Sequence, residues 1–278
     1  MLQFLTYLFI AIYTATVIGI ILVVILGNRN PLKTIPWVVV LIFAPVVGLV
    51  FYFFFGQDLR RKRIISRRTY KRLMVYALPA HVRRSDAPVP AACQSLSTLL
   101  TNTSQAVSFY GSRLTHYGDG ASKMTALLEE IEKARDHIHI LYYIFCDDET
   151  GARLQQALIR KAKEGVKVRV LYDDVGCNGV KKEFFQQMRD AGAEVHALLH
   201  VRFPMLTDRV NYRNHRKIVV IDGRVGFFGG MNIADRYVKG PGWGVWRDSH
   251  FKVEGKGVYG LQLSLIHISE PTRLRRIS

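Results

Sequence analysis

The amino-acid sequence predicts a two-helix transmembrane hairpin followed by one α/β domain, with a mixed, largely parallel sheet flanked by helices. Two observations indicate this organisation. Charged residues are absent from residues 1–27 and again from residues 34–57. Farther along the chain, helix-like and strand-like stretches alternate from residue 123 to residue 198, an order that is typical of α/β folds.

The predicted hairpin occupies residues 1–58, with spans at about residues 4–26 and 36–55. Each apolar stretch reaches the roughly 20 residues that an α-helix needs to cross the hydrocarbon of a bilayer. A cleaved signal peptide is the alternative for the first stretch. It would need a basic start and a small-residue cleavage site, and the sequence has neither before the second stretch begins.

Basic residues concentrate in residues 59–90, which we interpret as a juxtamembrane segment and linker. The positive-inside rule places this segment, and the domain that follows it, in the cytoplasm. The basic run can also hold the domain against anionic lipid headgroups. Nucleic acid is a third possible partner for a chain of net charge +17, but we do not expect it, because ten positive charges are juxtamembrane. These are Arg60, Arg61, Lys62, Arg63, Arg67, Arg68, Lys71, Arg72, Arg83 and Arg84.

The α/β domain is expected at residues 91–262, after a proline-containing linker. Its elements are predicted by apolar residues at helical spacing and by short runs rich in β-branched and aromatic residues. The three cysteines (Cys93, Cys146 and Cys177) lack metal-ligand spacing and suit a reducing compartment. Helices are predicted at 123–135, 153–163 and 181–190, and strands at 138–145, 166–172 and 194–198.

Some polar residues could suggest a metal site, but we favour structural roles for them. Asp173 and Asp174 follow a predicted strand at the edge where open α/β sheets bind ligands, but we favour a helix-capping turn over a metal site for them. Two histidine pairs have no carboxylate or thiol cluster beside them, so we do not expect zinc. The aromatic residues 142–145 are interpreted as core packing, with an edge that could line a lipid cleft. The histidine pairs are His137 with His139 and His196 with His200.

The most informative stretch is Asn214–Asn232, which reads NHRKIVVIDGRVGFFGGMN. His215 and Lys217 lie two residues apart on a predicted strand, so both side chains are expected on one face. The apolar run at residues 218–221 is typical of a strand that is buried on both sides. A bare H-x-K pair would carry little information, but here it is followed by further polar and glycine positions at fixed spacing.

A hairpin turn and a glycine pair complete this pattern. Asp222 begins a turn that returns the chain as a second strand at residues 225–228. Gly229 and Gly230 then allow the backbone to approach a ligand closely, and Asn232 follows them. Six positions fixed together are far more specific than any one of them.

Together these positions resemble the HKD motif of the phospholipase D superfamily, with Gly230 where that family usually has serine. The resemblance extends to bacterial cardiolipin synthases through the G-Q-D-L-R-R-K sequence after the second apolar stretch, the Tyr142–Phe145 strand and the Trp246–Asp248 segment. It covers nearly all of residues 1–262. It implies a multi-pass protein of the bacterial inner (cytoplasmic) membrane, with its catalytic domain in the cytoplasm.

The resemblance also implies a phosphatidyltransferase that makes cardiolipin from phosphatidylglycerol through a phosphohistidine. A neutral imidazole can attack phosphorus, and the family assigns this role to His215. Lys217 and Asn232 are expected to neutralise and orient the phosphoryl oxygens. Asp222 is expected to support the loop and the orientation of the histidine, and Asp248, a looser match, to orient a partner histidine. No metal or organic cofactor is required.

This mechanism needs a second histidine as leaving-group acid, and the sequence has no second H-x-K-x4-D pattern. Residues 263–273, LSLIHISEPTR, resemble a translated sequencing adapter. We therefore interpret residues 263–278 as a non-native tail, and the chain as a truncated first half that is inactive alone. A genuine amphipathic C-terminus is the alternative. Two other functions stay open: a membrane-tethered, single-motif phospholipase D-type phosphodiesterase or nuclease acting as a homodimer, and a non-catalytic membrane scaffold.

Overall fold

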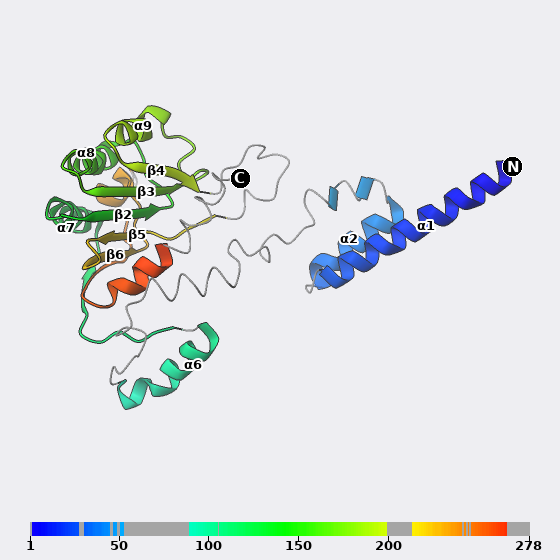
Figure 1. Cartoon of the computed structure of the whole chain (residues 1–278), viewed down its shortest axis with the longest axis horizontal. Helices are drawn as coiled ribbons and strands as arrows, with labels where there is room; N and C mark the ends of the chain where they lie inside the picture. Colours follow the sequence, from blue (N-terminus) through cyan, green and yellow to red (C-terminus); the bar gives the residue numbers. More distant parts are fainter. Residues whose placement is uncertain are drawn as a thin grey trace. The chain divides into compact units, whose positions relative to one another are not determined.

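The computed structural model of the chain describes residues 2–27, 31–44, 47–48, 51–52, 89–104, 106–198, 213–240, 242, 244 and 246–265. The chain divides into two compact units (Figure 1). The first comprises Met1–Arg63 with Val201–Tyr212, and the second comprises Ile64–His200 with Arg213–Ser278. The predicted basic segment at residues 59–88 and the residues 266–278 of the predicted tail lie outside the described residues.

Two helices, α1 (Leu2–Gly27) and α2 (Pro31–Phe43), pack side by side in the described part of the first unit (Figure 1). Leu41 of α2 is buried, and the rings of Trp37 and Tyr52 meet edge to face with centroids 5.5 Å apart. The second predicted span, at residues 36–55, is described only in part. Within the described residues, no helix combines the length and the apolar character that crossing a membrane requires.

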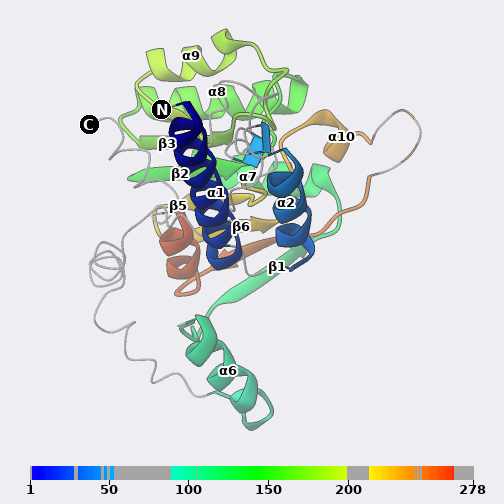
Figure 2. The same cartoon turned by 90° about the vertical axis from the view of Figure 1, so that its right-hand side faces the viewer.

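A seven-stranded sheet organises the second unit, in the order β1-β7-β6-β5-β2-β3-β4. The strands β2, β3 and β4 pair in parallel, and the four other pairings are antiparallel. The sheet is mixed, as predicted, but the prediction that it is largely parallel is wrong. At one edge β1 lies beside β7 (Figure 2). The strands are β1 (Arg113–Tyr117), β2 (His137–Tyr142), β3 (Lys167–Asp173), β4 (Glu194–Leu198), β5 (Ile218–Ile221), β6 (Val225–Gly229) and β7 (His250–Glu254).

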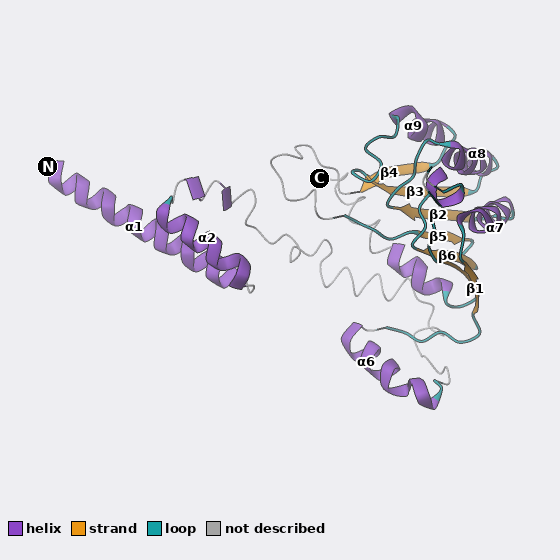
Figure 3. Ribbon diagram, turned by 180° about the vertical axis from the view of Figure 1, so that it is seen from behind, coloured by secondary structure: helices purple, strands orange, loops and turns teal. Residues whose placement is uncertain are grey.

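Helices cover both faces of this sheet, as predicted. α7 (Gly120–Glu132), α8 (Glu149–Lys163) and α9 (Lys182–Asp190) lie on one face (Figure 3), and a short helix at residues 258–265 lies on the other. The alternation of side chains along each strand supplies both cores. Ile140 of β2 packs in the cluster under α7, α8 and α9, whereas its neighbour Leu141 packs in the cluster that contains Val258 and Leu265.

The predicted starts of α7 and α8 are three and four residues late, because an aspartate caps each helix before its first apolar residue, whereas α9 begins one residue after its predicted start. Asp119 accepts a hydrogen bond from the N–H of Ser122 and begins α7, and Asp148 accepts one from the N–H of Gly151 and begins α8. The strand β4 matches its predicted bounds, whereas β5 begins only at Ile218 and β2 ends three residues before the predicted end at Phe145. Several elements were not predicted: the 3-10 helix η3 (Ala91–Cys93), α6 (Gln94–Ser104), β1, α10 (Asp235–Val238), β7 and the helix at residues 258–265.

Candidate active site

His215 lies on the extended segment at residues 213–217, because β5 begins only at Ile218. The prediction that His215 and Lys217 belong to a strand is therefore wrong, although the two residues do lie together. The His215 side chain is exposed to solvent. Its ring stacks on the ring of Tyr143, with centroids 3.8 Å apart and an angle of 25° between the planes.

Lys217 is the last residue before β5, and only 7% of it is exposed. Its Nζ donates to the backbone carbonyl oxygen of His215 at 2.6 Å and lies 5.3 Å from the centroid of the Tyr143 ring. Burial lowers the pKa of Lys217, and the negative charge of Asp248 opposes this change in part. The structure thus brings the ammonium group of Lys217 and the imidazole of His215 to the same ring, that of Tyr143.

Tyr143 is the site residue that the sequence interpretation missed. Tyr142 and Phe145 are fully buried, which confirms core packing for these two residues of the aromatic run. The strand β2 ends at Tyr142, however, and Tyr143 is only partly buried. Its ring supports His215 by stacking and attracts the ammonium of Lys217 through its π face.

Asn232 connects the motif to the segment that follows β2. Only 4% of this residue is exposed. Its Oδ1 accepts a hydrogen bond from the N–H of Ile144 at 3.1 Å, and its Nδ2 donates to the hydroxyl of Tyr237 at 2.7 Å. The bridge between Phe145 and Ile233 continues this pairing. An amide nitrogen carries two hydrogens, so the second one is available for the expected contact with a phosphoryl oxygen.

Gly229 and Gly230 leave room for the segment at residues 248–250. A β-carbon on Gly230 would lie 2.1 Å from Oδ1 of Asp248, and one on Gly229 would lie 2.5 Å from the carbonyl oxygen of Ser249. Gly229 also has a φ of 157°, which disfavours other residues. The N–H of Gly230 donates to the carbonyl oxygen of Ser249 at 2.9 Å. The glycine pair therefore brings Asp248 directly against the motif.

Asp222 lies at the opposite end of β5 from His215. Its carboxylate accepts three backbone hydrogen bonds of 2.9 Å each, from the N–H groups of Arg135, Asp136 and His137. Burial by itself raises the pKa of Asp222, but these N–H donors outweigh it and hold the pKa below its ordinary value. The carboxylate of Asp222 thus fixes the turn between α7 and β2, and the structure does not bring it to His215.

Asp173 anchors the chain just before His215. This carboxylate is completely buried, and it accepts hydrogen bonds from the N–H groups of Val175 and Gly176 at 3.0 Å, which makes it a turn-capping residue. It also pairs with the guanidinium of Arg213 and accepts from the N–H of Asn214, both at 3.3 Å. The last residue of β3 thereby holds Arg213 and Asn214, the two residues directly before His215. The spacing of residues in the sequence does not reveal this link. Within the described residues, no group of three or more histidines, cysteines or carboxylates could hold a metal ion.

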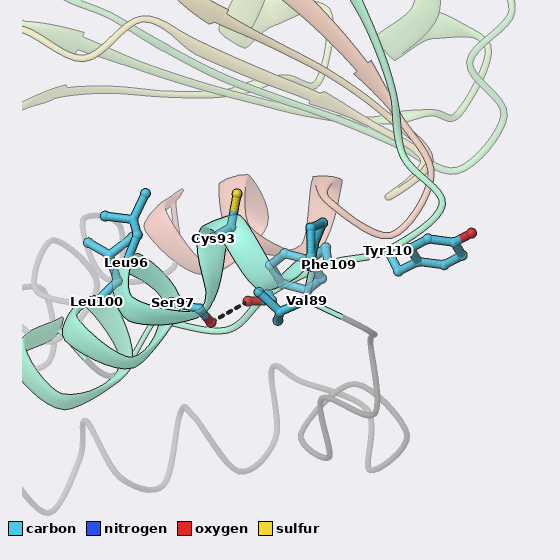
Figure 4. A pocket seen from close by; sticks show the side chains of 9 residues that line it. Val89, Cys93, Leu96, Ser97, Leu100, Phe109 and Tyr110 are labelled. Atoms are coloured by element: carbon cyan, nitrogen blue, oxygen red, sulfur yellow. Dashed lines mark hydrogen bonds between the residues drawn. The ribbon is translucent and has the colours of Figure 1, made fainter.

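A separate depression of about 340 Å³ lies at the segment that leads into the domain (Figure 4). Apolar side chains of α6 and of the stretch after it surround a hydrogen bond of 3.2 Å between Ser97 and Ser108. None of the motif residues lines this depression, so it is distinct from the candidate active site. The residues labelled around it are Val89, Cys93, Leu96, Ser97, Leu100, Phe109 and Tyr110.

Comparison with known proteins identifies two matching families. Residues 127–240 match the family described as "Cardiolipin synthase, PLD-like domain", and residues 14–57 match the one described as "Phospholipase_D-nuclease N-terminal". These two matches cover the strands and loops that carry the candidate site and most of the apolar N-terminal region.

Individual relatives agree with these families. Cardiolipin synthase 1 of Bacillus anthracis is 38% identical over 264 residues, which cover 92% of this chain and 52% of that protein. The major cardiolipin synthase ClsA of Bacillus subtilis is 37% identical over 255 residues, which cover 88% of this chain and 53% of that protein. The solved structure of NucT from Helicobacter pylori has a TM-score of 0.44 and 17% identity, covering 58% of this chain and 98% of that one. The chain spans about half the length of the curated relatives that it matches.

Proposed function

Because the chain belongs to the cardiolipin synthase family of phospholipase D-like proteins, we propose that it is the first half of a phosphatidyltransferase that makes cardiolipin from phosphatidylglycerol. The observation that carries this proposal is the grouping of His215 and Lys217 on the ring of Tyr143. An exposed imidazole next to a held ammonium group is suited to attack on a phosphodiester. The relatives, which are about twice as long as this chain, supply the argument for a second half.

The proposed reaction has two steps. A ring nitrogen of His215 attacks the phosphorus of phosphatidylglycerol, the P–O bond to the terminal glycerol breaks, and glycerol leaves with a proton from an acid in the second half. The hydroxyl of a second phosphatidylglycerol then attacks the phosphohistidine and gives its proton to the same group, now acting as base, so that cardiolipin is released. Lys217, with the free amide hydrogen of Asn232, stabilises the phosphoryl oxygens. Asp248, which lies against Gly230, orients the partner histidine.

Membrane attachment through α1 and α2 is part of this proposal. Residues 1–27 contain no charge, and ten basic residues follow the second apolar stretch, which supports a two-span hairpin with the catalytic domain in the cytoplasm. The test replaces the native cysteines with serine and introduces N30C or D86C. A membrane-impermeant maleimide added to intact cells should label position 30 and spare position 86. The reverse pattern would invert the topology.

The function is tested on the complete reading frame. Sequencing the parent gene past the codon for Gln262 should reveal a second H-x-K-x4-D motif, and a stop codon near Ser278 would favour the homodimeric phosphodiesterase instead. Membranes that contain the complete protein should convert labelled phosphatidylglycerol to cardiolipin. His215→Ala should abolish both the phosphoenzyme and the product, whereas His137→Ala, at the far end of β2, should leave turnover unchanged. Cleavage of DNA without any cardiolipin synthesis would reject the lipid substrate.

A further inference from the structure

His250, the first residue of β7, is an imidazole that is completely enclosed by protein. None of its surface is exposed, and neither ring nitrogen has a hydrogen-bond partner among the described residues. A β-carbon on Gly229 would lie 2.7 Å from its Nδ1, so the ring lies directly under the glycine pair of the motif. Nearly all buried polar groups have a partner, and this imidazole therefore requires a function.

Two lysines from different parts of the fold act on this ring. They are Lys123 of α7 and Lys217 of the motif. Lys217 directly precedes β5, in which Ile218 lies opposite Phe228, and Gly229 lies opposite His250, so Lys217 and His250 lie on either side of Gly229. Burial, followed by these two positive charges, lowers the pKa of His250 to about 2. The ring is therefore neutral, with a lone pair on one nitrogen and a hydrogen on the other.

Lys123 is the second enclosed base of this cluster. Its Nζ donates to the hydroxyl of Tyr142 at 2.9 Å and lies 3.6 Å from Sδ of Met124, and none of the residue is exposed. Burial lowers the pKa of Lys123 to about 7. Its contacts with Tyr142 and Met124 hold the Lys123 side chain within the domain core.

We propose that His250 is a positioning residue for Lys217, whose ammonium donates to one nitrogen of the His250 ring. An ammonium group has three N–H bonds. The carbonyl oxygen of His215 takes one and His250 takes the second, which directs the third at a phosphoryl oxygen. The structure does not show this contact, since both His250 nitrogens lack a partner among the described residues, and making it requires a rearrangement of the flexible four-carbon stem of Lys217. This inference rests on the proposed function, because it assumes that Lys217 binds phosphate.

The first test examines the 278-residue chain in detergent by NMR, with 15N in its histidine rings and with or without inorganic phosphate. His250 should stay neutral from pH 5 to 8 (about one unit or more either side of an ordinary histidine pKa), and one ring nitrogen should show the shift of a hydrogen-bonded acceptor. Lys217→Met should abolish that shift. The matched control is Lys252→Met. Lys252 lies on β7, as His250 does, but it pairs with Glu130. Titration of His250 near its ordinary pKa, or an equal response to both variants, would overturn the proposal.

The second test compares His250→Gln with His250→Leu in the complete enzyme. Glutamine retains an acceptor and a donor, whereas leucine retains neither. His250→Leu should lower kcat/KM about 10- to 100-fold and move the alkaline limb of the pH profile to lower pH, because an unsupported ammonium loses its proton more easily. His250→Gln should restore most of the activity and the original limb. Equal loss in both variants with an unchanged pH profile would reject positioning by His250. Should the wild-type enzyme make no cardiolipin, the proposed function fails, and the NMR experiment still decides the role of His250.

Discussion

The ring of Tyr143 lies under the imidazole of His215, with centroids 3.8 Å apart. Tyr143 directly follows β2, an inner strand of the sheet whose last residue, Tyr142, is completely buried. The exposed imidazole of His215 therefore rests on an aromatic ring that directly follows the buried end of β2. The same ring faces the ammonium of Lys217, so one side chain determines how the two reactive groups lie relative to each other.

Replacement of Tyr143 should therefore affect turnover more than stability. In the complete enzyme, Tyr143→Leu should lower kcat about 10- to 100-fold, because both the stacking and the cation–π contact are lost. Tyr143→Phe should stay within about 3-fold of wild type, since the ring remains. Tyr172→Leu is the control, because Tyr172 stacks on Phe185 at the same 3.8 Å but away from the motif. Equal losses of turnover in Tyr143→Leu and Tyr172→Leu would mean that the stacking contributes only to folding.

The contact between Gly230 and Asp248 predicts a strong coupling between these positions. Gly230→Ala places a methyl group where the carboxylate of Asp248 lies, and should destabilise the protein by about 1–3 kcal/mol. In an Asp248→Ala background the same change should have little effect, which a double-mutant cycle of chemical denaturation measures. Gly179→Ala serves as the control, because nothing lies within 4 Å of its β-carbon. Additive effects of Gly230→Ala and Asp248→Ala would contradict the contact.

Asp222 should stabilise the fold in a pH-dependent manner. Asp222→Asn removes acceptor capacity facing three N–H donors and should lower the free energy of unfolding at pH 7 by about 1–3 kcal/mol. The pKa of Asp222 is lowered in the folded state, so its stabilisation is complete above the unfolded pKa of about 3.9 and is lost as the pH falls through the folded value.

The difference in stability between wild type and Asp222→Asn should accordingly be constant above about pH 5 and shrink below about pH 4. Urea denaturation at pH 7 and at pH 3 measures it. A difference that grows with acidification would show that the carboxylate is not the group that binds the turn between α7 and β2.

Asp173 should be important for both folding and the site. Asp173→Ala removes the buried acceptor of Arg213 and of the Asn214 N–H, and should cost about 3–5 kcal/mol of stability. Asp190→Ala, which changes an exposed carboxylate bonded to Gln186, should change stability by less than about 0.5 kcal/mol. Thermal unfolding monitored by circular dichroism distinguishes them, and an Asp173→Ala protein as stable as wild type would reject the anchoring role.

Local patterns in the sequence predicted the elements that are strongly apolar. The continuous apolar run at residues 218–221 forms β5, without the predicted extension to His215, and the short strand at residues 194–198 appears with its predicted bounds. The hairpin turn at Asp222 also appears where it was expected. These elements have one dominant cause, burial of β-branched and aliphatic side chains, and such a cause is legible in a single stretch of sequence.

Elements that depend on distant partners were not predicted. β1 and β7 are rich in charged and polar residues, and they are strands because they pair with each other and with β6. The contacts of Tyr143 were missed because the predicted strand continued to Phe145. β2 ends at Tyr142, so Tyr143 lies just beyond the strand and is only partly buried. The anchoring by Asp173 and the enclosure of His250 join segments that are remote in sequence, and no spacing rule relates them.

The pairing of β1 with β7 also concerns the order in which the protein is made. Arg113 lies opposite Glu254, and Tyr117 lies opposite His250, so β1 leaves the ribosome long before its partner exists. Until then both β1 and the outer side of β6 are open strand edges, which readily pair with other chains, and such long-range pairings form slowly. A ribosome stalled before the codon for Glu254 would therefore display a sheet that lacks both a complete β7 and the helix at residues 258–265. In the interval between synthesis of β6 and synthesis of β7, the strand edges of this domain are therefore most open to pairing with other chains.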